Sequence, residues 1–231
     1  MDQTGQTGTI LTHDVKIPSG ETTLEGELSV PVGATGVVLF AHGSGSSRHS
    51  PRNQAVARVI RESSVGTLLF DLLTREEEAV DMRTRHLRFD IQLLARRLVD
   101  ATNWVKREGD IRHLRVGYFG ASTGGGAALV AAAEMGEEIG AVVSRGGRPD
   151  LAGEALPRVK SPTLLIVGGD DVPVIEMNEE AYARLLCEKE LKIVPNATHL
   201  FEEPGAIEEV ARLAARWFER HLQPRANVVA E

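Results

Sequence analysis

The pattern with the clearest chemical potential is Gly120-Ala121-Ser122-Thr123-Gly124, a Gly-x-Ser-x-Gly arrangement. An apolar run precedes it and an alanine-rich run follows it, so we expect Ser122 at a sharp turn from a strand into a helix. Such a turn exposes the serine hydroxyl at the end of the strand, and the helix N-terminus offers free N–H groups nearby. Those donors can stabilise the oxyanion of an acyl-transfer intermediate, so the pattern predicts a nucleophilic serine.

Other uses of a glycine-rich turn fit the spacing less well. The five-residue pattern alone is expected by chance in roughly one chain in ten of this composition, so its setting between strand and helix carries the argument. A Walker phosphate loop needs a lysine near its end, and a dinucleotide fingerprint needs Gly-x-Gly-x-x-Gly; neither is present here. A turn that only packs a helix closely on the sheet is the remaining structural explanation.

A serine hydroxyl becomes a strong nucleophile only when a base removes its proton and an acid orients that base. In folds with this serine turn, the chain order is serine, acid, histidine. His199 follows the last apolar run and is predicted to be the base, whereas His221 fits the apolar stripe of the final helix. We favour Asp171 as the acid because it follows the preceding strand, with Asp170 and Asp150 as alternatives.

The loop His42-Gly43-Ser44-Gly45-Ser46-Ser47 follows the apolar run at 37–41. In this kind of fold the second oxyanion donor comes from that loop. We therefore predict an oxyanion hole formed by the backbone N–H groups of Thr123 and Ser44, with Gly45 as an alternative donor. His42 stands at the end of a buried strand, where a histidine is typically a structural hydrogen-bonding residue.

Two arginines lie in the glycine-rich loop that follows the run at 141–143. Arg145 and Arg148 are predicted to hold a carboxylate or phosphate group of the substrate, because a guanidinium binds such groups through two parallel hydrogen bonds. Pairing with nearby acidic residues is the alternative. The other histidines show no metal-ligand spacing such as His-Glu-x-x-His, so we expect no metal, and no cofactor is called for.

The elements that must position these residues alternate along the chain. Residues 9–17 and 22–30 alternate apolar and polar side chains around a turn, which predicts an antiparallel hairpin at a sheet edge. Further on, continuous apolar runs typical of buried parallel strands lie at 37–41, 67–70, 116–119, 141–143, 164–167 and 191–194. Helical periodicity separates them, at 53–62, 86–106, 122–135, 176–187 and 206–222. This alternation predicts an α/β fold, and the segment 72–85 is interpreted as a solvated loop or short helix.

Composition limits the remaining possibilities. The 231 residues carry a net charge of −7 without a basic run, which disfavours nucleic-acid binding. We predict a single domain over 9–222 between flexible ends at 1–8 and 223–231. The single cysteine excludes an internal disulfide. Without a recognisable leader or an apolar run of about 20 residues, we expect a cytoplasmic protein that does not bind membranes and is a monomer or homodimer.

Taken together, these motifs resemble those of the α/β-hydrolase fold superfamily, and within it the dienelactone-hydrolase-like group. The resemblance spans residues 10–222 and rests on the loops at 42–47, 120–124, 144–150, 168–171 and 197–201. It implies a mostly parallel, twisted sheet of about eight strands with helices on both faces and no separate cap domain. It also implies carboxylic-ester hydrolysis through Ser122, His199 and Asp171, with an acyl-enzyme intermediate.

The chain departs from this group at the nucleophile. True dienelactone hydrolases use a cysteine, whereas this chain has Ser122 in the turn and its only cysteine at Cys187. A thioesterase, an acyltransferase or a small peptidase would use the same triad, and a non-catalytic ligand-binding protein is a further alternative. Because aromatic residues make up only 4% of a short chain, we expect an open pocket for short, polar or anionic esters.

Overall fold

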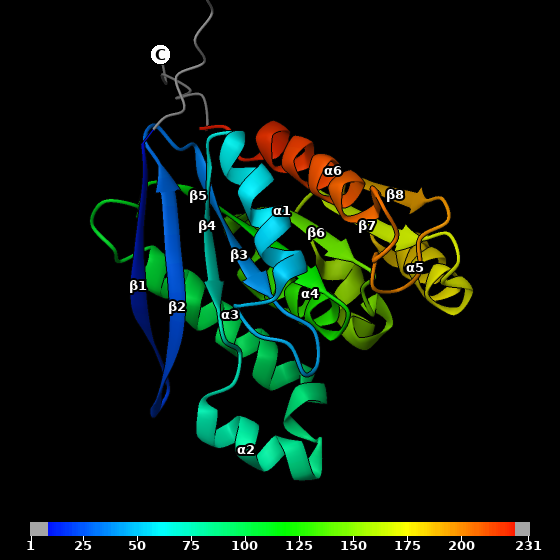
Figure 1. The fold of residues 1–231 in the computed structure, drawn as a ribbon, viewed down its shortest axis with the longest axis horizontal. Helices are drawn as coiled ribbons and strands as arrows, with labels where there is room; N and C mark the ends of the chain where they lie inside the picture. The colour runs from blue at the N-terminus through cyan, green and yellow to red at the C-terminus, as the bar shows by residue number, and fades with distance from the viewer. Residues whose placement is uncertain (1–8, 225–231) are drawn as a thin grey trace, which may run out of the picture.

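The computed structural model describes residues 9–224, which form one twisted sheet covered by helices on both faces (Figure 1). The eight strands of this part are β1 (Ile10–Ser19), β2 (Thr22–Pro31), β3 (Gly36–Ala41), β4 (Val65–Phe70), β5 (Arg115–Ala121), β6 (Ile139–Arg145), β7 (Thr163–Gly168) and β8 (Lys189–Val194). Their order across the sheet is β1-β2-β4-β3-β5-β6-β7-β8. The pairs β1–β2 and β2–β4 are antiparallel and the others are parallel, so the predicted α/β fold and edge hairpin are confirmed.

Six α-helices lie in the described residues: α1 (Pro51–Glu62), α2 (Arg75–Thr84), α3 (Ile91–Val105), α4 (Thr123–Met135), α5 (Val172–Arg184) and α6 (Ala206–His221). Three short 3-10 helices accompany them: η1 (Leu87–Phe89), η2 (Gly136–Glu138) and η3 (Pro149–Arg158). Helices α1 and α6 pack together on one face of the sheet (Figure 1). Helices α3, α4, η3 and α5 cover the other face.

Each face of the sheet has its own hydrophobic core. All residues of β3, β4, β6 and β7 are buried, because helices cover both sides of these central strands. Side chains such as Leu39 and Tyr118 point to the core under α3 and α4, whereas Phe40 and Phe119 belong to the core under α1 and α6. The period-2 alternation of a strand therefore divides one continuous apolar run between two cores.

The prediction of one helix over 86–106 is wrong in its first turn. The chain forms η1 and then begins again at α3, where the Asp90 side chain accepts a hydrogen bond from the N–H of Leu93 at 3.0 Å. Just before this break, the buried carboxylate of Asp81 accepts the N–H groups of Leu87 and Arg88, at 2.8 and 3.2 Å. A side chain that takes these donors supplies an alternative to the helical ladder, which sequence periodicity does not reveal.

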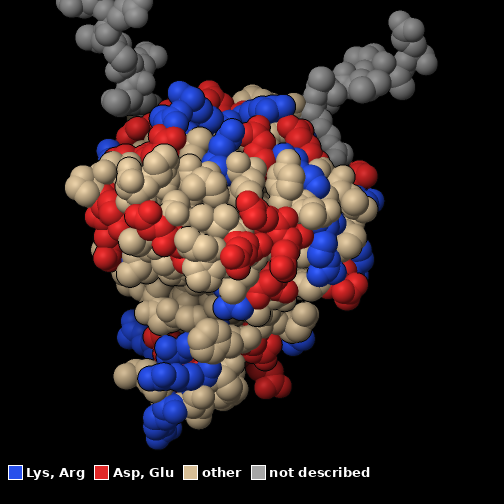
Figure 2. Space-filling model, turned by 90° about the vertical axis from the view of Figure 1, so that its right-hand side faces the viewer, with Lys and Arg blue, Asp and Glu red and all other residues tan. Residues whose placement is uncertain are grey.

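The segment 72–85 was interpreted as a solvated loop or a short helix, and the structure has a short helix there, α2. Thr74 and Glu77 form a capping box at the start of α2, with bonds of 2.8 and 3.2 Å. In Figure 1 this helix stands beyond the sheet, on the side toward which β3 and β4 point. Its exposed arginines include Arg75, Arg83 and Arg85, and Figure 2 shows basic side chains gathered on the narrow lower end of the molecule.

The chain ends lie largely beyond what the structure describes. The flexible ends predicted at 1–8 and 223–231 fall outside the described residues, except for Gln223 and Pro224. Within residues 9–224, no helix combines the length and the hydrophobicity that crossing a membrane would need.

Six parallel strands end at one edge of the sheet, and the predicted site residues follow five of them. The loop that begins at His42 comes after β3, Ser122 comes directly after β5, and Arg145 is the last residue of β6. Asp171 follows β7 by three residues, and His199 follows β8 by five. In open α/β sheets, ligands bind at the carboxyl ends of the strands, so the fold gathers the predicted site residues where such a site is expected.

Candidate active site

Ser122 occupies a strained turn between β5 and α4. Its backbone angles are φ 51° and ψ −123°, a region that costs free energy for any residue with a side chain. The glycines on either side permit the turn: a Cβ on Gly124 would lie 2.1 Å from the carbonyl oxygen of Ala41. A Cβ on Gly120 would lie 2.4 Å from the carbonyl oxygen of Gly124. The turn therefore has the backbone geometry that presents a nucleophile at the end of a strand.

His199 and Asp171 are joined by a hydrogen bond between Nδ1 and Oδ2 of 2.7 Å. Asp171 stands at the N-cap position of α5, yet its side chain does not cap that helix and instead contacts His199. The Asp171 side chain is only 14% exposed and that of His199 is 38% exposed. A carboxylate on Nδ1 favours the tautomer that leaves Nε2 unprotonated, the form that a general base needs.

The alternative acids are placed differently. Both oxygens of Asp150 are bonded to Arg148, at 2.8 and 2.7 Å. Asp170 is exposed, and its backbone N–H donates to the carbonyl of Ala197. His221 lies on α6 against the ring of Trp217, 4.5 Å away between ring centroids. Of the three predicted acids, the structure brings only Asp171 within hydrogen-bond distance of His199.

Ser122 and His199 line a common cavity of about 220 Å³, which we call the nucleophile cavity. Its walls are Gly43, Ser44, Ser46, Ser50, Arg52, Ala121, Ser122, Arg145, His199 and Leu200. No hydrogen bond joins the hydroxyl of Ser122 to His199 in the described part of the chain, and such bonds often tighten only when substrate is present. The two side chains thus face one space, in which an ester carbonyl would meet both.

The loop after β3 lies against the serine turn. A Cβ on Gly43 would be 3.2 Å from the Cβ of Ser122, and the hydroxyls of Ser44 and Thr123 are 3.0 Å apart. The backbone N–H groups of Ser44 and Thr123 have no hydrogen-bond partner among residues 9–224. Neither predicted oxyanion donor is therefore used within the described residues, so both N–H groups are free to bind a developing negative charge.

Arg48 anchors this loop to the rest of the sheet. Its backbone N–H donates to Asp71 at 2.8 Å, and its guanidinium contacts both Asp71 and Glu25, the latter at 2.9 Å. Its carbonyl accepts a hydrogen bond from Gln54 at 3.0 Å. The hydrogen bond from Arg48 also holds the pKa of the Glu25 carboxyl below its usual value. Strands β2 and β4 therefore hold the far end of the loop.

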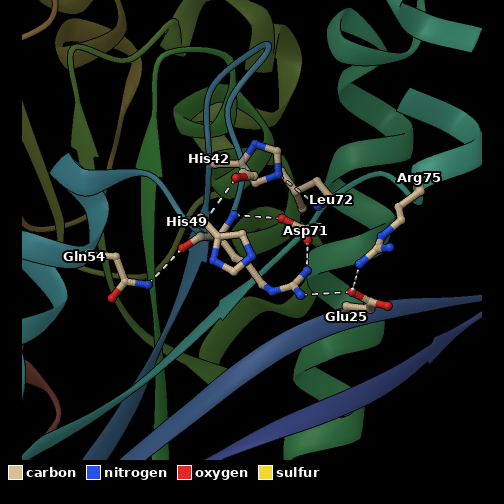
Figure 3. Close-up of polar contacts among 9 residues, drawn as sticks. Glu25, His42, His49, Gln54, Asp71, Leu72 and Arg75 are labelled. Atoms are coloured by element: carbon tan, nitrogen blue, oxygen red, sulfur yellow. Dashed lines mark hydrogen bonds and ion pairs between the residues drawn. The ribbon is translucent and has the colours of Figure 1, made fainter. Parts of the chain in front are cut away.

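His42 holds the near end of the same loop. Its Nε2 accepts the N–H of Leu72 at 3.0 Å, and its Nδ1 lies 3.0 Å from the carbonyl of Gly43 (Figure 3). Nδ1 therefore carries the proton, and the ring is neutral. Burial lowers the pKa of His42, which keeps it in that state. These contacts fit a hydrogen-bonding residue that fixes the loop rather than a base.

The two predicted substrate-binding arginines have different surroundings. Arg148 bonds to Asp150 and does not line the nucleophile cavity. Arg145 lines that cavity and is 7% exposed. Within the described residues, the only hydrogen bond of its guanidinium is a long one of 3.5 Å to Asn53, and the group lies 5.7 Å from the ring centre of Phe201. Of the two arginines, the structure brings only Arg145 to the cavity that Ser122 lines.

A second cavity of about 380 Å³ lies beside the first, and we call it the α2 cavity. Its lining includes His42, Gly45, Leu72, Leu73, Glu78, Asp81, Met82, Arg88, Leu94 and Thr123, together with Ser44 and Ser46, which it shares with the nucleophile cavity. Burial raises the pKa of Glu78 on its wall, and the nearby charge of Asp71 acts in the same direction. Helix α2 thus gives the site a partial wall, although residues 9–224 form no separate cap domain.

Sequence patterns did not single out Arg52, Arg48 or Asp71. Arg52 is the second residue of α1, and Arg48 lies in the loop before that helix. Asp71 is the first residue after β4, and this position at the carboxyl end of a strand is the one sequence signal that could have placed it near the site. Nothing in their spacing marks them, because their partners come from distant segments of the chain.

Comparisons with known proteins agree with this arrangement. Residues 34–224 match the dienelactone hydrolase family. Among solved structures, a dienelactone hydrolase from Anabaena variabilis shares 63% identity at a TM-score of 0.91, over 93% of this chain and 99% of that one. The structure of Est1E from Butyrivibrio proteoclasticus has 14% identity and a TM-score of 0.75, over 90% and 98% of the two chains, a likeness of fold alone.

Curated relatives are longer than this chain. Two Mycobacterium tuberculosis proteins, provisionally named phosphoribosyl transferases, are 56% identical over 210 residues. That region is 91% of this chain but only 46% of theirs, so the chain spans about half the length of these relatives. The family match covers most of the chain, including the serine turn, Asp171 and His199. The chain therefore belongs to the dienelactone hydrolase family.

Proposed function

We propose that the protein is a serine hydrolase that cleaves small carboxylic esters through Ser122, His199 and Asp171. The observation that carries this proposal is the 2.7 Å bond between Asp171 and His199, whose side chain lines the same cavity as the strained Ser122. A largely buried acid, an oriented imidazole and a partly exposed serine have no comparable structural use, because the strain at Ser122 costs free energy without stabilising the fold.

The reaction proceeds in two half-reactions. His199 takes the proton of the Ser122 hydroxyl as the oxygen attacks the ester carbonyl, and the proton then passes to the leaving alcohol. The N–H groups of Ser44 and Thr123 stabilise the oxyanion. Water, deprotonated by the same imidazole, hydrolyses the acyl-enzyme and restores the serine. Asp171 holds the ring in its productive tautomer and stabilises the imidazolium that forms twice in each cycle.

Family membership supports a hydrolase, and the residues of this chain support the serine type. The nucleophile position holds Ser122, and Cys187 lies outside the nucleophile cavity, where burial raises the pKa of its thiol. A thiolate mechanism therefore has no suitable residue in the described site. The transferase name of the longer relatives does not bear on this choice, because the matched region is less than half of each of them.

Covalent labelling tests the nucleophile directly. A fluorophosphonate probe at neutral pH should add once to the wild-type protein, as read by intact mass, and peptide mapping should locate the adduct on Ser122. The adduct should be absent from Ser122→Ala and present in Ser46→Ala, which alters another serine of the same cavity. An unlabelled wild-type protein would remove the basis of the proposal.

Matched substrates test the reaction class. With oxygen-ester, thioester and anilide substrates of the same acyl group, we expect the highest kcat/KM for the oxygen ester. The cavity has no described feature that protonates an amine leaving group beyond His199 itself, so amide cleavage should be slowest. Preference for the thioester would replace the esterase assignment with a thioesterase on the same triad.

A further inference from the structure

Arg145 is a buried cation without a matching anion. It is 7% exposed, its Nε has no hydrogen-bond partner, and it forms no ion pair with any carboxylate in residues 9–224. Burial lowers its pKa to about 10, and the charge of Arg52 acts in the same direction. Removing a guanidinium from water without pairing it is costly, so proteins retain such groups mainly where a ligand completes them.

Other positive features lie on the same side of the nucleophile cavity. Arg52 lines the cavity, and its Nε is also buried without a partner, although its Nη1 reaches the exposed Glu202 at 3.0 Å. The N-terminus of the twelve-residue helix α1 opens there, since its N-cap Ser50 is part of the wall. Two arginines brought together repel each other, and the helix dipole adds to the positive potential. The described part of the wall contains no acidic side chain to offset them.

The number and kind of donors favour phosphate over carboxylate. One guanidinium can satisfy both oxygens of a carboxylate, whereas a phosphate group has three terminal oxygens and up to two negative charges. Here two guanidinium groups and serine hydroxyls face one small space, and the dipole of α1 adds positive potential, a combination that suits a phosphate group. We propose that Arg145 and Arg52 form a subsite for a phosphate group carried by the ester substrate, beside Ser122.

This inference rests on the proposed function, because it assigns a substrate class to the same site. Ser122, His199 and both arginines line one cavity of about 220 Å³, so a phosphate on the arginines leaves room for only a few atoms before the scissile carbonyl. The substrate is therefore a short ester whose acyl or alcohol part ends in phosphate. Binding energy from the phosphate would fix the carbonyl against the nucleophile.

Binding of inorganic phosphate tests the subsite without any turnover. Phosphate should raise the melting temperature of the wild-type protein and compete with a neutral ester, 4-nitrophenyl acetate. Arg145→Met should weaken phosphate binding at least tenfold, and Arg52→Gln should weaken it less, because Arg52 is shared with Glu202. Arg148→Met is the matched comparison and should bind phosphate like the wild type, since its guanidinium is held by Asp150. Equal affinities in wild type and Arg145→Met would overturn the proposal.

Arg52→Gln keeps the test decisive if Arg145→Met does not fold. The Arg52 side chain is 35% exposed, so it can be replaced without disturbing the core, and a wild-type phosphate affinity in this variant would argue against a shared subsite. Sodium chloride at matched ionic strength controls for general screening of the arginines. A rise in melting temperature that chloride reproduces equally would show that no phosphate site exists.

Three esters of equal chain length then identify the anion. The 4-nitrophenyl esters of 3-phosphonopropionic, succinic and butyric acid carry a phosphonate, a carboxylate and a methyl group at the same position. After subtraction of the uncatalysed rates, kcat/KM should be highest for the phosphonate ester, and Arg145→Met should reduce this preference at least tenfold. Preference for the succinate ester would replace phosphate with carboxylate, and equal rates would overturn an anionic subsite.

The two levels of inference fail separately. If Ser122 takes no fluorophosphonate and none of the three esters is cleaved, the proposed hydrolase function falls. Phosphate binding that depends on Arg145 would still be observed by thermal shift in that case. If the neutral ester is cleaved but phosphate neither binds nor inhibits, the hydrolase stands and the phosphate subsite falls.

Discussion

The nucleophile cavity and the α2 cavity share Ser44 and Ser46, yet Arg145 in the first and Arg88 in the second differ in whether an acidic side chain pairs with them. In the α2 cavity, Arg88 contacts the buried carboxylate of Asp81 through its side chain and its backbone. In the nucleophile cavity, Arg145 has no acidic partner among the described residues. One arginine is therefore neutralised by the fold itself, and the other is left for a ligand.

The function of a charged side chain in a cavity depends on whether the fold itself supplies its counter-charge. A buried pair such as Arg88 and Asp81 has a structural role, because it joins η1 to α2. An unpaired buried cation raises the free energy of the folded protein, so we infer that a bound ligand supplies the missing anion. The strained backbone of Ser122, like unpaired Arg145, raises the free energy of the folded protein without a structural return. Substitutions in the two cavities should therefore have different effects.

Removing the nucleophile should have the largest effect. Ser122→Ala is expected to lower kcat for a neutral ester by about 10⁴-fold to 10⁶-fold, because only binding and the oxyanion donors remain. The melting temperature should not fall, since the hydroxyl makes no hydrogen bond in the described residues. Retained turnover in this variant would move the chemistry away from the nucleophile cavity.

Changing the acid that orients His199 should come next. Asp171→Asn is expected to lower kcat by about 10⁴-fold, because an amide at Nδ1 favours the wrong imidazole tautomer. Asp170→Asn provides a neighbouring control and should stay within about twofold of wild type, since a solvated side chain contributes little. If the two variants lost activity equally, the pairing of Asp171 with His199 would not explain the catalysis.

The loop between the two cavities should matter through its anchor. Arg48→Gln breaks the contacts to Asp71 and Glu25, so the N–H of Ser44 should lose its fixed position. We expect kcat to fall about tenfold with little change in KM, since an oxyanion donor acts mainly in the transition state. Arg75→Gln, which removes only an exposed contact to Glu25, is the control. A change confined to KM would show that Arg48 acts on substrate binding instead.

The α2 cavity should respond in stability rather than in chemistry. Asp81→Asn weakens the contact to Arg88 while keeping the shape of the side chain, so the melting temperature should fall by several degrees. The rate with a neutral ester at saturating substrate should change much less than in Asp171→Asn. A loss of turnover as large as that of Asp171→Asn would show that the α2 cavity takes part in the reaction, and would erase the contrast with the nucleophile cavity.

The smallest effect concerns pH. Burial lowers the pKa of His42 below its ordinary value of 6.5, so the unfolded chain binds a proton at a higher pH than the folded protein does. Stability should therefore be complete above pH 7 and decline as the pH falls from 6.5 toward 5. Thermal melts of His42→Gln should show a weaker decline, with His221→Gln as the comparison, because burial also lowers the pKa of His221. Parallel curves for wild type and His42→Gln would contradict this assignment.

Much of the fold could be predicted because its signals are local. The apolar runs and helical periodicities place all eight described strands and the helices α1, α4 and α6 to within two residues at each end, as at 37–41 for β3 and 206–222 for α6. The break between η1 and α3 could not be predicted, because it depends on the Asp81 carboxylate taking the N–H groups of Leu87 and Arg88. Periodicity reports which face is apolar and says nothing about such competing donors.

The strand-to-helix turn at Ser122 could be predicted from the sequence alone, because neighbouring glycines and apolar runs are sufficient to specify that turn. It also narrowed the partners to His199 and a few aspartates. The tertiary structure was needed to show that Asp171 contacts His199 and that Arg145 has no partner acid among residues 9–224. These facts depend on segments far apart in the chain, such as Arg145 and Asn53 at a separation of 92 residues, which only the folded sheet and its helices bring together.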